Sequence, residues 1–258
     1  MSTLYNDTDP YVARWLRNLI AAGHINAGDV NEQSIADLTP DDLTGITRFH
    51  AFAGIAGWDY ALHLAGWPDD LPVWTGSCPC QPFSVATRSG RGTTDARHLW
   101  PAWFRLIRQC RPQFVFGEQV PGAIGHGWLD GVCADLEAEG YTCGATVLGA
   151  HSVGAPHIRN RLWWVADAHR DRWERRIQMG EGEEGETFDK QTGSSGADSQ
   201  WNKWNTVQFR NGHERRIECG LKPLAHGVPC RVGRLRAYGN AIVPQVAAVF
   251  IRAVMEGL

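Results

Sequence analysis

The stretch ITRFHAFAGIAGWDYALHLAG, residues 46–66, predicts a strand, a turn of small residues and a helix. Residues 46–52 form a mostly apolar run of strand length, which passes into the small residues 53–57. Beyond the turn, apolar residues recur at helical spacing until Gly66, where the helix should end: Tyr60, Ala61, Leu64 and Ala65. A turn of this kind lets the backbone approach a bound ligand closely.

The remainder of the chain alternates between the same two kinds of element. A first helix is expected where Thr8 or Asp9 can cap it and Pro10 suits its first turn. Further helices are expected at 99–110, around 129–136 and after Pro244, and strands at 73–78, 114–116, 142–148 and 162–166. This alternation predicts an α/β fold with a doubly wound, mainly parallel sheet.

The overall composition indicates a cytosolic protein. The 258 residues carry a net charge of −3, and no basic tail points to a nucleic-acid partner. Seven irregularly spaced cysteines are typical of reduced thiols rather than of a disulfide framework. The sequence has neither a signal-peptide profile nor an apolar run of membrane-spanning length, so we expect a soluble, cytoplasmic protein.

The composition changes between residues 169 and 222, which are rich in Gly, Glu, Ser, Arg and Asn. Larger apolar residues are isolated there, and no helical or strand period is evident. Between residues 201 and 216, cationic side chains stand beside aromatic ones, a mixture that suits phosphate contacts and base stacking. We interpret this stretch as a variable region attached to the α/β domain.

A cysteine in a proline-flanked loop follows the apolar run 73–78. The loop reads PCQPFS, residues 79–84. Enzymes with α/β folds expose nucleophiles in such loops at the carboxyl edge of the sheet. The hexapeptide resembles the Pro-Cys-Gln-x-Phe-Ser motif of the DNA (cytosine-5) methyltransferases, which implies that Cys80 is the nucleophile. The other six cysteines are expected to be structural, and Cys78 alone does not make a metal site.

Two further motifs supply acid and cationic groups. Residues 117–120, GEQV, resemble the family's Glu-Asn-Val motif, with Gln119 in place of Asn, and imply that Glu118 faces ring nitrogen 3 of the cytosine. Residues 154–161, GAPHIRNR, resemble the Gln-x-Arg-x-Arg motif, with His157 in place of Gln. The resemblance implies catalytic roles for Cys80, Glu118, Arg159 and Arg161, and substrate contacts from Gln81, Ser84, Arg159 and Arg161.

The turn 52–57 resembles the family's Phe-x-Gly-x-Gly-Gly turn, although Ala56 replaces one glycine. Residues 239–244, GNAIVP, resemble the family's last motif, which completes the cofactor pocket. The resemblance implies that S-adenosylmethionine is the cofactor and that it is bound by Phe52, Ala53, Gly54, Ile55, Ala56, Gly57, Trp58, Pro79, Asn240, Ala241 and Ile242.

The stretch of chain between the cofactor-binding turn and the cysteine loop is shorter here than is usual in the family. Members of the family usually have two more strands between the turn that binds the methyl donor and the cysteine loop. In this chain that turn, the donor turn, is residues 52–57, and only residues 58–76 separate it from the loop. Those strands carry the acids that contact the ribose and adenine of the cofactor. Residues 28–38 resemble the segment that normally precedes the cysteine strand, so we hypothesise that the N-terminal region supplies the adenine contact through Asp29 or Asp37.

Together these motifs predict a Rossmann-like methyltransferase that flips a cytosine out of double-stranded DNA and methylates carbon 5 through a Cys80 adduct. The expected divisions are an N-terminal helix and polar segment (1–45), a catalytic domain (46–168), a target-recognition region (169–225) and a C-terminal segment (226–258) that returns to the catalytic domain. We expect a monomeric enzyme of phage or prophage type, working in a bacterial host. A tRNA cytosine-5 methyltransferase and a DNA-binding relative without catalysis remain as alternatives.

Overall fold

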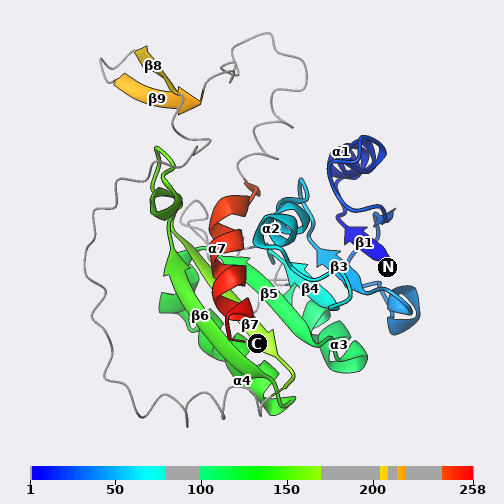
Figure 1. Ribbon diagram of the computed structural model, residues 1–258. Coiled ribbons are helices and arrows are strands. Elements are labelled where there is room, and N and C mark those ends of the chain that lie inside the picture. The colour runs from blue at the N-terminus through cyan, green and yellow to red at the C-terminus, as the bar shows by residue number, and fades with distance from the viewer. Residues whose placement is uncertain (1, 80–98, 170–203, 209–213, 219–239, 258) are drawn as a thin grey trace.

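The computed structural model describes residues 2–79, 99–169, 204–208, 214–218 and 240–257. A seven-stranded sheet with the strand order β2-β1-β3-β4-β5-β7-β6 forms its centre (Figure 1). The strands are parallel except for β7, which runs antiparallel to both neighbours. The sheet consists of β1 (Thr3–Asn6), β2 (Asp29–Asn31), β3 (Arg48–Ala51), β4 (Val73–Gly76), β5 (Phe114–Gln119), β6 (Thr142–Leu148) and β7 (Arg161–Asp167).

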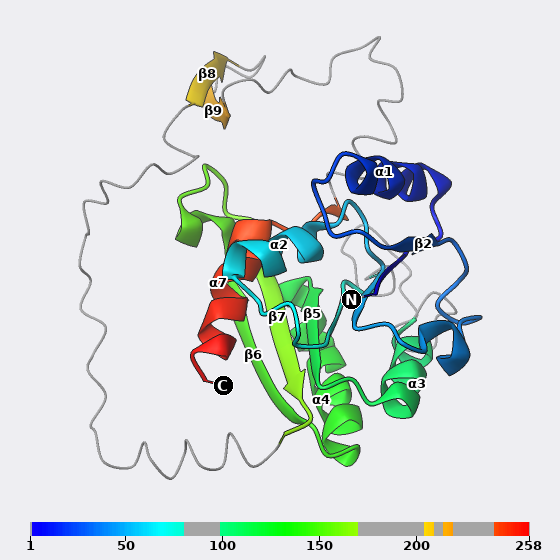
Figure 2. The same cartoon turned by 45° about the vertical axis from the view of Figure 1, so that its right-hand side comes forward.

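Helices cover both faces of this sheet, as Figures 1 and 2 show. On one face, α2 and α7 pack against each other over the middle strands, and α1 lies over β1. On the other face, α3 and α4 bury a cluster of tryptophans. These helices are α1 (Pro10–Ala21), α2 (Gly57–Ala65), α3 (Trp100–Cys110), α4 (Trp128–Ala138) and α7 (Pro244–Met255), joined by the 3-10 turns η1 (Pro40–Leu43), η4 (Pro121–His126) and η5 (Ala150–Val153).

The expected α/β fold with its mainly parallel, doubly wound sheet is confirmed. The central expected elements are present, because 46–66 folds as β3, a turn and α2. Asp9 caps α1, where its Oδ1 accepts a hydrogen bond from the backbone N–H of Tyr11 at 2.9 Å. The variable stretch contains an antiparallel hairpin, which the sequence did not suggest, formed by β8 (Trp204–Gln208) and β9 (Glu214–Glu218).

The N-terminal segment differs from the expectation. Besides the predicted helix, it contributes β1 and β2, and β1 pairs with β3 in parallel over Thr3–Asn6. Residues 1–45 therefore belong to the same sheet as the expected catalytic domain, and the division at residue 45 does not follow the structure. The two strands were missed because they are 4 and 3 residues long, too short to show the alternation of a strand. They take sheet positions beside the donor turn, although they precede it in the chain.

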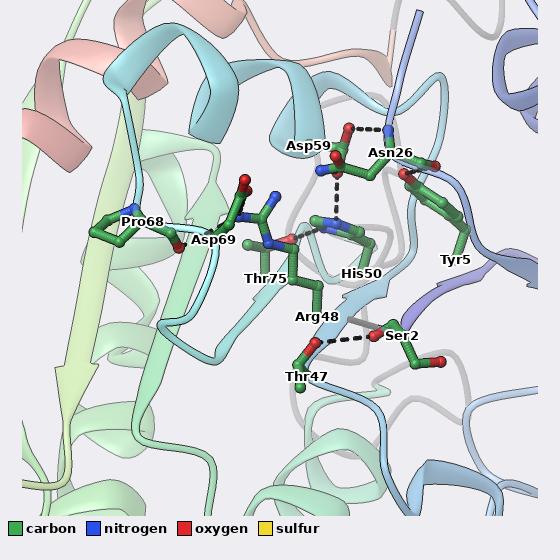
Figure 3. Close-up of polar contacts among 10 residues, drawn as sticks. All are labelled: Ser2, Tyr5, Asn26, Thr47, Arg48, His50, Asp59, Pro68, Asp69 and Thr75. Carbon is green, nitrogen blue, oxygen red and sulfur yellow. Dashed lines mark hydrogen bonds and ion pairs between the residues drawn. The ribbon is translucent and has the colours of Figure 1, made fainter. Parts of the chain in front are cut away.

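A buried polar cluster joins the N-terminal segment to β3, β4 and α2 (Figure 3). The Asp59 carboxylate accepts hydrogen bonds from the backbone N–H of Asn26 at 3.0 Å and from its side-chain amide at 2.8 Å. His50 Nε2 lies 3.3 Å from Asp59 Oδ1, and His50 Nδ1 lies 2.8 Å from the Thr75 hydroxyl. Tyr5 stacks on the His50 ring and donates to the Asn26 carbonyl at 2.9 Å. This cluster holds β1, β3, β4 and α2 together across the sheet.

Among the described residues, none of the helices has the length and apolar character needed to cross a membrane. Over the same ranges, no three His, Cys, Asp or Glu side chains gather closely enough to hold a metal ion.

Candidate functional site

A cavity of about 350 Å³ opens at the carboxyl ends of β1, β3, β4 and β5. Parallel α/β sheets bind their ligands at this edge, because the loops that follow the strands gather there. One wall comes from the donor turn and the segment after β1, and the opposite wall comes from the ends of β4, β5 and β7.

Glu118 and Arg161 form the polar centre of the second wall. They lie on the antiparallel neighbours β5 and β7, and Arg161 Nε is 2.8 Å from Glu118 Oε1. Glu118 is 8% exposed. Burial raises the pKa of the Glu118 carboxyl above its ordinary value, although Arg161, a hydrogen bond from Ser77 and Arg159 act in the opposite direction. A carboxyl group of this kind can carry a proton toward a ring nitrogen.

The two predicted arginines are separated in the structure. Arg161 lines the cavity, but Arg159 lines a second, open pocket together with His157 and Ile55. Arg159 adopts a φ of +32°, and its guanidinium donates to the backbone carbonyl of Ala241 at 2.5 Å. It therefore ties the chain before β7 to the segment that leads into α7. The geometry assigns Arg159 a structural contact that its expected catalytic role did not include.

The donor turn presents part of its backbone to the cavity. Phe52 and Gly54 line the cavity, each with a φ of +53°, and Gly54 N–H donates to Asp7 Oδ2 at 3.0 Å. Ala53 is buried, and its N–H donates to the carbonyl of Asn6 at 2.9 Å. The turn is thus fastened to the end of β1, a segment that lies far from it in the chain.

The remaining predicted cofactor contacts are divided between two places. Pro79 and Asn240 line the cavity, whereas Ile55, Ala241 and Ile242 line the second pocket. A further three residues of the turn do not line the cavity: Ala56, Gly57 and Trp58. Ala56 holds a left-handed φ of +63°, where the family motif has a glycine.

Trp58 and Gly57 are buried for packing reasons. A Cβ atom on Gly57 would lie 2.6 Å from Cγ1 of Ile242, so the missing side chain makes room for the C-terminal segment. Trp58 is 3% exposed and packs against Phe116 and Trp163, because the first turn of α2 points this position into the sheet. Trp58 therefore does not line the cavity, and its cofactor contact stays a prediction.

Several cavity residues were missed at the level of sequence. Asp7 and Asp9 line the first wall, whereas the hypothesised Asp29 and Asp37 do not line the cavity and are exposed. The acids of the N-terminal region that line the cavity are therefore Asp7 and Asp9, and the adenine contact itself stays a prediction. The signal that could have found Asp7 is an acid directly after a strand, but β1 was too short to be recognised.

Gln119, which replaces the family's Asn, closes the base of the cysteine loop. Its side-chain amide donates to the Cys78 carbonyl at 3.2 Å, and its Oε1 accepts from the N–H of Val120 at 2.9 Å. Cys78 and Pro79 line the cavity where the chain enters the loop. The predicted residues Cys80, Gln81 and Ser84 lie outside the described residues.

The first wall fits the chemistry of S-adenosylmethionine. The volume of about 350 Å³ lies in the range of small-molecule sites. The carboxylates of Asp7 and Asp9 can accept hydrogen bonds from hydroxyl and ammonium groups, and Phe52 offers an aromatic surface to a flat ring. The positive φ at Gly54 brings backbone close to the cavity without a side chain in the way.

Comparison with known proteins places the chain among cytosine methylases. The family model described as C-5 cytosine-specific DNA methylase matches residues 66–206, more than half of the chain. The type II methyltransferase M.AplI of Arthrospira platensis is 32% identical over 105 residues, which are 40% of this chain and 29% of that protein. M.AgeI of Thalassovita gelatinovora is 33% identical over 109 residues, 40% of this chain and 25% of that protein.

These matches therefore span less than a third of either curated relative. Among solved structures, the Dnmt2 methyltransferase of S. pombe aligns over 99% of this chain and 98% of its own, with a TM-score of 0.51 and 15% sequence identity. This similarity shows a shared fold.

Proposed function

The chain belongs to the family of C-5 cytosine-specific DNA methylases, and we propose that it methylates carbon 5 of cytosine in double-stranded DNA with S-adenosylmethionine as the methyl donor. The observation that carries this proposal is the pair formed by the buried Glu118 and the half-buried Arg161. It forms one wall of a cavity whose other wall is the donor turn with Phe52 and Gly54. Glu118, Arg161 and the donor turn thus line the same cavity. Cys78 and Pro79, which directly precede Cys80 in the chain, line it as well.

S-adenosylmethionine, when bound, supplies an electrophilic methyl group. Asp7, Asp9 and Phe52 are the residues that would hold it, together with backbone groups around Gly54. Asp7 is already oriented for this task, because the N–H groups of Gly54 and Asp9 both donate to its carboxylate. A carboxylate fixed by two backbone donors keeps its acceptor directions constant, which favours a ligand with matching hydroxyl groups.

Cys80 is the proposed nucleophile, assigned from its motif. Its thiolate adds to carbon 6 of the cytosine, and electron density moves onto ring nitrogen 3 and carbon 5. Glu118 gives its proton to nitrogen 3, so the ring stays neutral while carbon 5 becomes nucleophilic. Once carbon 5 carries the methyl group, water accepts the carbon-5 proton and the electron pair of the C–H bond restores the 5,6 double bond. Cys80 then leaves as its thiolate, and nitrogen 3 returns its proton to Glu118. The charge of Arg161 stabilises the Glu118 carboxylate once its proton is given away.

Residues 169–225 are the proposed target-recognition region, because they occupy the variable place in the motif order. The hairpin of β8 and β9 falls within this region. Arg159 lies before β7, and its contact with Ala241 joins this part of the catalytic domain to the segment that follows the region and leads into α7.

The proposal is tested with tritiated S-adenosylmethionine, unmethylated double-stranded DNA and, separately, unmodified tRNA. The labelled polymer is digested, and its nucleosides are identified by mass spectrometry. Cys80→Ser is the test variant, and Cys133→Ser, at a half-buried cysteine on α4, is the matched control. We expect 5-methylcytosine in DNA from the native protein and from Cys133→Ser, and none from Cys80→Ser.

Other outcomes have distinct meanings. Label in tRNA alone would reject DNA as the substrate. Label that persists in Cys80→Ser would reject the nucleophile. No label together with no binding of S-adenosylmethionine, measured by calorimetry, would favour a DNA-binding relative without catalysis.

A further inference from the structure

Trp58 and Ser77 lie beside Glu118, and the mechanism above uses neither of them. Ser77 follows β4 directly, is half-buried and lines the cavity. The indole Nε1–H of Trp58 donates to the Ser77 hydroxyl oxygen over 3.1 Å. Ser77 and Glu118 directly follow Gly76 and Gly117, which are paired across β4 and β5, so the two side chains lie at neighbouring strand positions and both line the cavity. At this place the Ser77 hydroxyl can donate a hydrogen bond to the Glu118 carboxylate. These three side chains form a continuous chain of hydrogen bonds from α2 to β5.

The direction of this chain follows from its donors. An indole N–H can only donate, so the Ser77 oxygen accepts from Trp58. A hydroxyl group has a single hydrogen, and the carboxylate of Glu118 is the acceptor that faces it. Trp58 therefore removes the alternative in which Ser77 turns its hydrogen away from Glu118 and toward the indole.

The position of Trp58 is itself rigid. Its ring packs edge-on against Trp163 with centroids 5.5 Å apart, and it lies 6.3 Å from the ring of Phe116. These neighbours belong to β7 and β5, the strands that also carry Arg161 and Glu118. Displacing the indole would disturb the sheet under the catalytic acid, so the N–H direction is set by the core.

We propose that Trp58 and Ser77 are positioning residues that orient the Glu118 carboxyl group and set the pH at which it releases its proton. This inference rests on the proposed function for its catalytic meaning, but the hydrogen-bond chain can be tested without activity. Arg161 holds the carboxylate from β7, and Ser77 holds it from β4. With two donors in place, the carboxyl group has little freedom to rotate away from a base in the cavity.

The expected sign of the effect is definite. Ser77 donates to the ionised carboxylate and so lowers the pKa of Glu118, opposing the effect of burial. Loss of the hydroxyl group should therefore raise that pKa. Other charged groups face Glu118 as well: Arg161 on β7, Arg159 before it, and Asp7 and Asp9 across the cavity. All of these charged groups remain in the variants, so a change in the pKa of Glu118 can be attributed to the loss of the hydrogen bonds.

The test titrates the carboxyl carbon of Glu118 by NMR in protein labelled with ¹³C at glutamate, with Glu118→Gln to assign the signal. Ser77→Ala should raise the pKa of Glu118 by about one unit, as expected for one lost hydrogen bond to a carboxylate. Trp58→Phe keeps an aromatic ring but removes the N–H together with part of the indole, and should raise the pKa of Glu118 by a smaller amount. In the double variant the change should equal that of Ser77→Ala alone, because Trp58 acts through Ser77.

The controls separate this chain from general damage to the core. Trp67→Phe removes an indole from the same core cluster, where its N–H donates to the Leu71 carbonyl at 3.0 Å, and should leave the Glu118 titration unchanged. Ser77→Thr keeps a hydroxyl group and should restore the native titration if Ser77→Ala does not fold. The alkaline limb of kcat should move to higher pH in parallel with the titration.

Two results would overturn the inference. One is an unchanged Glu118 titration in Ser77→Ala; the other is an undiminished effect of Trp58→Phe when Ser77 is already Ala. Because the titration needs no turnover, it stays informative if the protein methylates nothing. In that case the proposed function fails, while the hydrogen-bond chain is judged on the titration alone.

Discussion

The substitution Asp59→Asn tests the buried cluster that joins the N-terminal segment to α2. Asp59 is 2% exposed. Burial acts to raise its pKa, but the contact with His50 and the two hydrogen bonds from Asn26 outweigh burial and lower the pKa from 3.8 to about 2. At about 1.4 kcal/mol per pH unit, the ionised carboxylate contributes about 2 kcal/mol to the free energy of unfolding.

The pH dependence of this contribution has a definite sign. The folded pKa lies below the unfolded one, so the stabilisation is present above about pH 4 and is lost as the pH falls through about 2. The free energy of unfolding of the native protein should exceed that of Asp59→Asn by about 2 kcal/mol at pH 5 and above, and by about 1 kcal/mol at pH 3. For a chain of this size, the difference at neutral pH corresponds to a fall in Tm of about 4–8 °C.

Urea unfolding followed by tryptophan fluorescence and circular dichroism measures both quantities. Asp70→Asn is the matched control, because Asp70 is exposed and should change stability by less than about 0.5 kcal/mol. The reasoning is refuted if Asp59→Asn matches Asp70→Asn at pH 7, or if its deficit is the same at pH 7 and pH 3.

Three further substitutions test the cavity and its supports. Asp7→Asn should weaken binding of S-adenosylmethionine about tenfold by calorimetry, while Asn in place of Asp29, outside the cavity, should leave it unchanged. Gly57→Ala should destabilise the fold by about 1–3 kcal/mol through its clash with Ile242, and Ile242→Ala should relieve more than about 1 kcal/mol of that cost in a double-mutant cycle. Arg159→Ala should lower stability by about 1–2 kcal/mol and speed proteolysis near Ala241 in limited trypsin digestion, since the contact between the two segments is lost; equal digestion rates would contradict this.

Local signals predicted much of the fold. The strand, turn and helix of residues 46–66 follow from apolar spacing and small residues, and the expected strand at 142–148 coincides with β6. Glu118 and Arg161 were identified one by one from short motifs, and the structure brings them within 2.8 Å. These features depend on residues that are close together in the chain, so the pattern of the sequence is enough to predict them.

Sequence patterns were enough to predict the class of fold, and the short motifs singled out Glu118 as the candidate acid. Which segments meet depends on packing between distant parts of the chain: β1 beside β3, Asp7 against Gly54, and Ser77 between Trp58 and Glu118. Strands of 3 or 4 residues are too short to show an alternation of polar and apolar residues. Their neighbours in the sheet are strands that lie far away in the sequence. The direction of a side chain such as Trp58 or Arg159 is likewise set by its packing, because the same motif is compatible with a cavity contact and a structural one.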